Sequence, residues 1–305
     1  MVASEYHVPV MLKECIEGLD IKPDGVYVDV TFGGGGHTRE MLKYLERGKL
    51  FAFDQDPDAK RNTEGLGEQF TLIEANFRFL KKYLRLHGIK KVDGILADLG
   101  ISSHQIDEGA RGFSIRFDGE LDMRMDQEAE KSAKVVVNEY SEEELVQVFR
   151  LYGELRNARQ IAQEIVKVRA SKAIETTTEL VDVIRKFAKR NAENKFLALV
   201  FQALRIEVND ELEVLKDLLE QSSEVLNENG RLVVMSYHSL EDRLVKNYLK
   251  SGKFEGEVEK DFYGNLIRPF KPLKSKPLVA SMDEIALNNR ARSAKLRIGI
   301  KLSTQ

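Results

Sequence analysis

The chain has 305 residues, of which 42% are hydrophobic, and its formal net charge is −3. This length and composition predict one large or two small soluble domains. They exclude a membrane span, because no apolar run reaches the required length, and the N-terminus lacks the basic start and apolar core of a secretion signal. The single cysteine, Cys15, excludes an internal disulfide, and together with the lack of a signal it predicts a cytoplasmic protein.

Strand-like and helix-like segments alternate over the first hundred residues or so. Short, mostly apolar runs predict strands, and the segments between them have the spacing of amphipathic helices. The expected strands are 26–30, 49–54, 70–74 and 92–99, and the expected helices are 8–19, 38–45, 57–63 and 77–86. Such alternation is typical of a parallel sheet with helices on both faces.

The alternation stops at residue 100. A long loop rich in Gly, Ser, Asp and Arg extends to residue 126, and residues 141–205 have only helical patterns. Ser141 and Glu144 match a capping box that opens one of these helices, and Thr177 is the expected cap of another.

Strand and helix patterns return towards the C-terminus. A long amphipathic helix is expected over 211–226, ended by Asn229-Gly230, and strands are expected at 231–236 and 295–302, with a helix at 240–249 between them. We therefore predict an α/β fold interrupted by an all-helical insertion. The predicted boundaries are 1–108 and 208–305 for the two parts of the α/β domain, and 109–207 for the insertion.

Four consecutive glycines, Gly33 to Gly36, follow the first predicted strand. Glycine adopts positive φ without strain and lets a ligand approach the backbone closely, and the helix after this turn offers unpaired N–H groups. Asp54 ends the second predicted strand, where an acid can accept hydrogen bonds from the ribose hydroxyls of an adenosine moiety. The pattern predicts a nucleotide-type cofactor. The simpler alternative is a flexible turn, with Asp54 as an ordinary turn aspartate.

The glycine spacing distinguishes two cofactor classes. A dinucleotide fingerprint requires G-x-G-x-x-G, and its last glycine would fall on Thr38 or Arg39 here. A cofactor without a pyrophosphate does not need that last glycine. The run from Asp29 to Gly33 instead resembles the first motif of class I methyltransferases, which use S-adenosylmethionine. A nicotinamide-dependent oxidoreductase is therefore the second hypothesis.

Polar residues also follow the ends of two further predicted strands. Asp98 ends the fourth strand, with Gln105 a few residues later, and Tyr237 and His238 leave the strand that follows the insertion. Ligands of open α/β sheets bind beyond the carboxyl ends of the strands, so we expect these side chains at one site. The alternatives are a strand-end turn around Asp98 and a helix cap at His238 or Ser239.

Positive charge is concentrated in two segments. Residues 150–195 hold eleven Lys and Arg against six Asp and Glu, and residues 266–305 hold nine against two. Such asymmetry permits contacts with nucleic-acid phosphates, although ordinary solvated faces have the same appearance in a sequence. The candidate phosphate contacts are Arg111, Arg124, Arg290, Arg292 and Lys295. No metal site is predicted, because the histidines and the cysteine lack metal-ligand spacing.

Eight motifs, taken in this order, resemble those of a known family. They are TFGGGGHT, AFDQDP, DLGISS, RGFS, LDMRMD, FQALRIEVN, SYHSLEDR and NRARSAKLRI. From His7 to Arg297 the chain resembles the bacterial ribosomal RNA small subunit methyltransferase H family. The resemblance implies a class I, Rossmann-like methyltransferase domain with an inserted helical domain. It also implies S-adenosylmethionine as the methyl donor and, as the product, N4-methylation of a cytidine in the decoding region of 16S ribosomal RNA.

The resemblance further implies a set of cofactor contacts. They are Gly33, Gly35, Gly36, His37, Asp54, Phe77, Asp98 and Gln105. Phe77 would pack on the adenine, and the glycine turn would face the methionine end. His104 and Glu120 stand where the family commonly has proline, which leaves the local loop shape open. The implied partner is 16S ribosomal RNA within the small ribosomal subunit, recognised by the insertion, and a homodimer is a further expectation.

The implied reaction needs a hydrogen-bond acceptor for the cytosine amine, whose lone pair is delocalised into the ring. Many amino-methyltransferases carry an Asn/Asp-Pro-Pro-aromatic stretch after the fourth strand, and this chain does not. We therefore expect Asp98, or a backbone carbonyl of residues 99–101, to accept from the amine, and Tyr237 and His238 to complete the base pocket. The base must be splayed from its stack to reach them. A non-catalytic RNA-binding protein is the third hypothesis.

Overall fold

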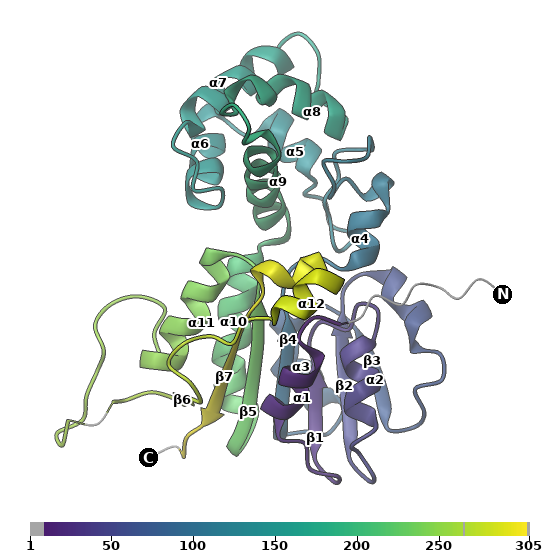
Figure 1. Ribbon diagram of the computed structural model, residues 1–305, viewed down its shortest axis with the longest axis vertical. Coiled ribbons are helices and arrows are strands. Elements are labelled where there is room, and N and C mark those ends of the chain that lie inside the picture. Colours follow the sequence, from purple (N-terminus) through teal and green to yellow (C-terminus); the bar gives the residue numbers. More distant parts are fainter. Residues whose placement is uncertain (1–8, 265, 304–305) are drawn as a thin grey trace. The chain divides into compact units, whose positions relative to one another are not determined.

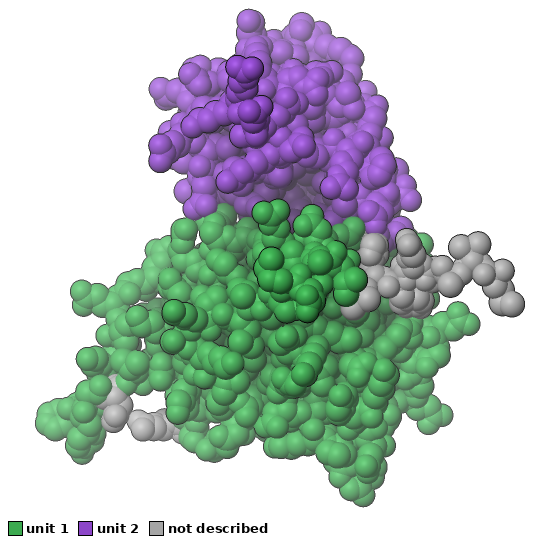
Figure 2. All heavy atoms as spheres, in the orientation of Figure 1, with its two compact units in different colours: residues 1–100, 212–305 green, residues 101–211 purple. Residues whose placement is uncertain are grey.

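The computed structural model of the protein describes residues 9–264 and 266–303. His7, where the family resemblance begins, lies outside these residues. The chain forms two compact units, coloured separately in Figure 2. The first combines the residues up to Gly100 with those from Leu212 onward, and the second spans Ile101–Glu211. Within the described residues, no helix combines the length and the apolar character that a membrane span would need.

The first unit contains a seven-stranded sheet of order β3-β2-β1-β4-β5-β7-β6. Its strands are β1 (Val26–Asp29), β2 (Lys49–Asp54), β3 (Phe70–Glu74), β4 (Val92–Asp98), β5 (Leu226–Ser236), β6 (Phe270–Pro272) and β7 (Lys295–Lys301). Neighbours from β3 to β5 are parallel, and β7 is antiparallel to both β5 and β6. The chain order reverses between β1 and β4, where open sheets of this kind bind their ligands. The predicted α/β fold is confirmed.

Helices cover both faces of this sheet (Figure 1). The helices around this sheet are α1 (Leu12–Leu19), α2 (Gly36–Leu42), α3 (Leu80–Leu86), α10 (Glu211–Val225), α11 (Ser239–Ser251) and α12 (Met282–Leu287), with 3-10 helices η1 (Pro57–Thr63), η2 (Phe77–Phe79) and η5 (Asn289–Ser293). Side chains alternate along a strand, so each strand feeds two cores. Tyr27 and Leu50 lie in the core with residues of α1 and α2, whereas Val28 and Phe51 lie in the core with residues of α3 and α10.

Some predicted boundaries in this unit are wrong. The first helix begins at Leu12 rather than at residue 8, because Met11 has a left-handed backbone with φ of 49°. The predicted strand 231–236 is longer and begins at Leu226, directly after α10. Its pairing with β4 shifts register after Leu226, so Asn229-Gly230 lies within the strand and does not mark the end of the helix, which is at Val225.

The second unit is helical and has a hydrophobic core of its own. Its helices are α4 (Ser103–Asp107), α5 (Ala133–Glu139), α6 (Glu142–Leu151), α7 (Ala158–Arg169), α8 (Thr177–Ile184) and α9 (Glu193–Asn209), with 3-10 helices η3 (Gly109–Arg111) and η4 (Arg185–Phe187). Phe149, Ile161 and Leu180 are fully buried in its core. These elements bring together the apolar stripes of the sequence, because each amphipathic helix must bury its apolar face against another.

The caps in this unit follow the expected chemistry with one correction. The Ser141–Glu144 capping box is present: the Ser141 N–H donates to Glu144 Oε2 at 2.7 Å, and the Glu144 N–H donates to Ser141 Oγ at 3.2 Å. The cap of α8 is Thr176 and not Thr177. Thr177 instead is buried, and its hydroxyl donates to the Phe117 carbonyl at 2.9 Å.

Candidate active site

Three acids end three neighbouring parallel strands of the first unit. Asp29 is the last residue of β1, Asp54 of β2 and Asp98 of β4. Because the carboxyl ends of parallel strands meet at one edge of a sheet, the three carboxylates lie along the edge at which the chain order reverses. This edge is the candidate site.

The glycine turn between β1 and α2 is in tight contact at one of its glycines and open at another. Gly33 and Gly35 have φ of 49° and 72°, which side-chain-bearing residues rarely adopt. A Cβ on Gly36 would lie 2.3 Å from Pro9 Cγ, so the turn is in tight contact there. A Cβ on Gly34 would meet nothing within 4 Å. The backbone is therefore accessible at Gly34, which fits a cofactor that approaches the turn closely.

Asp54 holds this turn in place. One oxygen of its carboxylate accepts the Gly33 N–H at 2.8 Å, and the other accepts the Asp56 N–H at 2.9 Å. Burial raises the pKa of Asp54 to about 6, although these two hydrogen bonds favour the ionised form. A carboxylate oxygen can accept more than one hydrogen bond, so Asp54 can serve the turn and still accept from a ribose hydroxyl.

Asp98, His37 and Tyr237 come together at the end of β4. The Tyr237 hydroxyl donates to Asp98 Oδ1 at 2.7 Å, and His37 Nδ1 lies 3.8 Å from Asp98 Oδ2. Burial raises the pKa of Asp98 to about 6, while His37 and the Tyr237 hydrogen bond oppose that rise. Burial and the Asp98 charge raise the pKa of Tyr237 well above its usual range, so Tyr237 stays protonated and donates.

Asp29 is a further buried acid of the site, and it was not among the residues predicted for it. Its carboxylate accepts from the Thr38 hydroxyl at 2.8 Å and from the Thr31 N–H at 3.1 Å. The Thr31 hydroxyl in turn accepts the Asp98 N–H at 2.7 Å. Asp29 thus braces the ends of β1 and β4 and the first turn of α2. The acid itself was visible in the sequence, but its partners were not.

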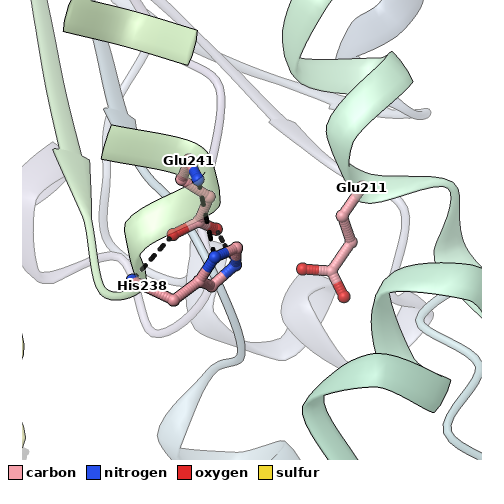
Figure 3. Close-up of side chains that lie close together, drawn as sticks. All are labelled: Glu211, His238 and Glu241. Carbon is pink, nitrogen blue, oxygen red and sulfur yellow. Dashed lines mark hydrogen bonds and ion pairs between the residues drawn. The ribbon is translucent and has the colours of Figure 1, made fainter. Parts of the chain in front are cut away.

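His238 caps helix α11. Its Nδ1 accepts from the Glu241 N–H at 3.5 Å, and its Nε2 lies 3.2 Å from Glu241 Oε1 (Figure 3). Glu241 Oε2 accepts from the Tyr237 N–H at 3.0 Å. The capping alternative considered for His238 is therefore what the structure shows, and its place in a base pocket stays a prediction.

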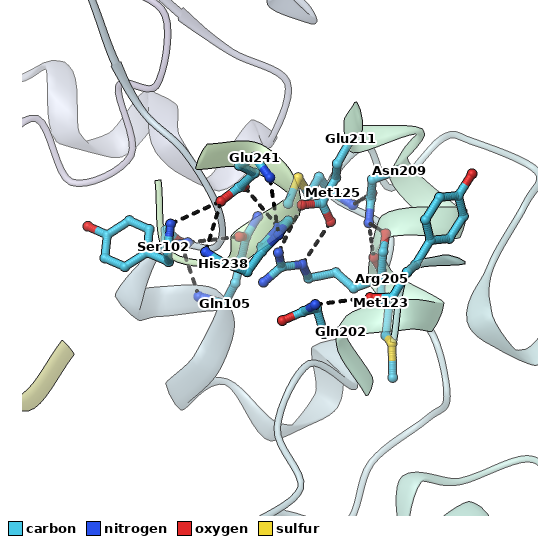
Figure 4. A network of polar contacts seen from close by, with 12 residues as sticks. Ser102, Gln105, Met123, Met125, Gln202, Arg205, Asn209, Glu211, His238 and Glu241 are labelled. Carbon is cyan, nitrogen blue, oxygen red and sulfur yellow. Dashed lines mark hydrogen bonds and ion pairs between the residues drawn. The ribbon is translucent and has the colours of Figure 1, made fainter. Parts of the chain in front are cut away.

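Phe77 and Gln105 have structural surroundings that do not decide their predicted roles. Phe77 begins η2 and is half-buried against the core that includes α3. Gln105 belongs to the second unit, where it forms a capping box with Ser102 (Figure 4): the Ser102 N–H donates to Gln105 Oε1 at 3.0 Å. Contact of either side chain with a cofactor stays a prediction.

Arg111 and Arg124 bind polar groups of their own loop, and their contact with RNA phosphates stays a prediction. Arg111 is only 7% exposed, and its guanidinium donates to the Arg124 carbonyl at 2.9 Å. Arg124 is bound to Asp122 at 2.5 Å and to the Ala129 carbonyl at 2.7 Å. Both side chains satisfy polar groups of the long loop, which sequence charge alone does not reveal.

Of the three predicted C-terminal cations, Arg290 and Arg292 lie in η5, and Lys295 is the first residue of β7. Lys295 pairs in register with Ser236 at the end of β5, so this segment lies at the same sheet edge as the three acids. Lys295 Nζ lies 3.4 Å from Asp242 Oδ2, and Arg292 is exposed. Arg290 is partly buried. Their contact with RNA stays a prediction.

Two of the family-like motifs bind one another within the second unit (Figure 4). Arg205 forms a bidentate pair with Glu211, at 2.7 and 2.9 Å. Asn209 accepts from the Met125 N–H and donates to the Met123 carbonyl, both at 2.8 Å. The segment FQALRIEVN therefore fixes the segment LDMRMD, a role that the spacing of the motifs did not indicate.

Comparison with known proteins identifies the family. Residues 4–302 match the MraW methylase family. Two relatives are each named ribosomal RNA small subunit methyltransferase H. One, from Cytophaga hutchinsonii, is 60% identical over 96% of this chain and 98% of its own, and one, from Flavobacterium johnsoniae, is 59% identical over 98% of each. Among solved structures, an rRNA methylase from Streptococcus thermophilus aligns over 99% of both chains at 14% identity, with a TM-score of 0.42. The chain, with its three strand-end acids and glycine turn, belongs to the MraW methylase family.

Proposed function

We propose that this protein transfers the methyl group of S-adenosylmethionine to the exocyclic N4 of a cytidine in the decoding region of 16S ribosomal RNA. The observation that carries this proposal is the family match over residues 4–302, with relatives at 54–60% identity named ribosomal RNA small subunit methyltransferase H. The nicotinamide-dependent oxidoreductase is not supported, because the family is one of methylases.

The residues at the strand ends fit the cofactor. When bound, S-adenosylmethionine supplies an electrophilic methyl group on a sulfonium and needs no metal. Asp54 would accept from the ribose hydroxyls, Phe77 would pack on the adenine, and the turn from Gly33 to His37 would lie at the methionine end. The accessible backbone at Gly34 supports this assignment.

Asp98 is the proposed acceptor for the cytosine amine. Above a pH of about 6 it is mainly ionised, and the Tyr237 hydroxyl fixes its orientation from one side. A carboxylate that accepts from the amine N–H increases electron density on the nitrogen as it pyramidalises. The backbone carbonyls of residues 99–101 are the alternative acceptors, and Tyr237 and His238 are proposed to bound the base pocket.

RNA recognition is proposed for two basic regions. One is the helical unit, predicted as the insertion 109–207, whose residues 150–195 carry the excess of Lys and Arg. The other is the segment with Arg290 and Arg292 in η5 and Lys295 at the start of β7. We also propose that the RNA is presented within the small ribosomal subunit, that the enzyme acts in the cytoplasm, and that it forms a homodimer.

The test is methyl transfer from radiolabelled S-adenosylmethionine to 30S particles and, separately, to protein-free 16S ribosomal RNA, followed by nucleoside analysis. N4-methylcytidine is the expected labelled product. Binding of S-adenosylhomocysteine with no transfer to either substrate would favour the non-catalytic RNA-binding hypothesis. Thermal stabilisation by NAD and not by S-adenosylhomocysteine would revive the oxidoreductase.

A further inference from the structure

The segment before α1 lies directly on the glycine turn. Pro9 contacts Gly36 so closely that a Cβ there would lie 2.3 Å from the proline Cγ. The Val10 carbonyl lies 3.1 Å from His37 Nε2, and this contact is buried. Both contacts fall on turn residues that are assigned to the methyl donor. Val10 and His37 lie 27 positions apart in the chain, so no local sequence pattern predicts this contact.

A carboxylate from the other end of the chain anchors this segment. The Met11 N–H donates to Glu284 Oε1 at 2.6 Å, across 273 positions of sequence. Met11 is fully buried and has a left-handed backbone, which is unfavourable for a side-chain-bearing residue and needs a partner to hold it. The Met11 carbonyl accepts the Cys15 N–H at 2.9 Å, so the same residue also starts α1. Glu284 sits in the first turn of α12, whose cap is Ser281.

The anchored segment places a hydrogen-bond acceptor, the Val10 carbonyl, against one ring nitrogen of His37. Since Nε2 faces a carbonyl, which only accepts, Nε2 carries the proton in the neutral ring. The other ring nitrogen, Nδ1, lies 3.8 Å from Asp98 Oδ2. A shift of Val10 would release the ring to the other tautomer or another orientation.

We propose that Glu284 is a positioning residue for the methyl-donor turn: by accepting the Met11 N–H, it holds Pro9 and Val10 against Gly36 and His37. The proposal rests on the proposed function in assigning the turn to S-adenosylmethionine. Glu284 does not touch the turn itself. It acts through the backbone of residues 9–11, which makes it distinct from the cofactor contacts inferred from the sequence.

The first test compares Glu284→Ala with Glu284→Gln, and uses Asp283→Ala on the same helix as the control. Two quantities are measured: the dissociation constant of S-adenosylhomocysteine by calorimetry, and the ring ¹⁵N shifts of His37 in the cofactor-free protein. We expect Glu284→Ala to weaken binding at least about tenfold and to mix the His37 tautomers, because the segment loses its anchor. Glu284→Gln keeps an acceptor oxygen and should rescue both quantities, and Asp283→Ala should match the wild type.

A second test does not alter Glu284. Gly36→Ala forces a Cβ against Pro9 Cγ, and Pro9→Ala removes that Cγ. We expect Gly36→Ala to weaken binding less in the Pro9→Ala background than in the wild type, so that the two changes are not additive. Additive effects would overturn the proposal, because Pro9 would then not act on the turn, and this holds even if Glu284→Ala fails to fold.

Two other outcomes would overturn the proposal: unchanged binding and unchanged His37 shifts in Glu284→Ala, or a Glu284→Gln variant that behaves like the alanine variant. Failure of the proposed function has a different signature. A wild-type protein that does not bind S-adenosylhomocysteine would refute the cofactor assignment, while the His37 shifts would still report whether Glu284 holds the segment.

Discussion

The ionised carboxylates of Asp54 and Asp98, at the strand ends, lower the stability of the folded protein because they are buried. Burial raises the pKa of both Asp54 and Asp98 from 3.8 to about 6. The folded chain therefore binds each proton more tightly than the unfolded chain, so stability falls as the pH rises from about 4 to about 6, and the full cost is present above that range. A shift of about two pKa units corresponds to roughly 3 kcal/mol per group. Retaining such groups is characteristic of sites that need a charged acceptor.

Asp98→Asn should separate the stability cost of the buried carboxylate from its proposed role as acceptor for the cytosine amine. We expect the variant to gain up to about 3 kcal/mol in unfolding free energy at pH 7.5 and much less at pH 4, since the ionised carboxylate is removed only where it was charged. The amide oxygen can still accept from Tyr237. Turnover should fall at least about tenfold, because a neutral amide is a weaker acceptor for the cytosine amine. Denaturant unfolding at both pH values and initial rates measure the two effects. Equal stabilisation at both pH values would refute the ionisation argument, and full turnover with cofactor bound would refute the acceptor role.

Tyr237→Phe should change the pH dependence of catalysis. The Tyr237 hydroxyl stabilises the ionised form of Asp98, so its removal raises the pKa of Asp98 further above about 6. We expect the acidic limb of kcat/KM to move to higher pH, with a smaller loss at pH 8.5. Tyr83→Phe is the control, because this ring lies in the core with α3 and packs edge-on against Phe53, with the ring centroids 6.1 Å apart. If the acidic limb of the kcat/KM profile does not move, ionisation of Asp98 does not control the pH dependence of catalysis.

At the level of elements, the pattern of apolar residues predicts the positions of the strands. Long-range contacts determine where helices begin, which residues cap them and which polar residues are buried. The strands at 49–54 and 70–74 have the predicted limits, because a buried strand needs an unbroken apolar run. The start of α1 was misplaced because Met11, the residue before the helix, is fixed by Glu284, more than 270 positions away. Likewise, nothing local shows that Arg111 is buried, or which of two adjacent threonines caps α8. The sequence offers candidate site residues where an acid or another polar residue ends a predicted strand. It does not show which of these side chains contact one another.

The glycine turn offers a matched pair of substitutions. Gly35→Ala forces a side chain onto a φ of 72° and places its Cβ 3.0 Å from the Phe32 ring. We expect it to lose about 1–3 kcal/mol of stability. Gly34→Ala meets nothing within 4 Å, so its stability should change by less than about 1 kcal/mol. Its methyl group would instead occupy the proposed cofactor space and weaken S-adenosylhomocysteine binding. Thermal melts and calorimetry test the pair, and unchanged affinity in Gly34→Ala would place the cofactor elsewhere.

At the scale of the whole molecule, a net charge of −3 hides an uneven distribution. The last forty residues carry nine Lys and Arg against two Asp and Glu, while the molecule as a whole is slightly acidic. The sequence shows this distribution but not its geometry. The pairing of Lys295 with Ser236 supplies the geometry, because it brings the start of β7 to the same edge as the strand-end acids. A basic segment beside a site that carries several carboxylates can attract an RNA backbone towards the site.

Neutralising this segment should weaken RNA binding in a salt-dependent way. We expect the combined change Arg290→Gln, Arg292→Gln and Lys295→Gln to reduce the slope of log K against log salt by up to about 2, since each phosphate contact on single-stranded RNA contributes about 0.7. The fold should survive, because Arg297 still pairs with Asp242 at 2.7 Å when Lys295 is replaced. The matched control is Lys22→Gln, Lys49→Gln and Lys90→Gln, three exposed cations next to the starts of β1, β2 and β4, at the opposite edge of the sheet. Filter binding across a salt series measures both triple variants. Equal slopes would assign RNA binding away from the start of β7, whereas a lower slope in the first variant alone would place RNA phosphates at the edge that carries Asp98.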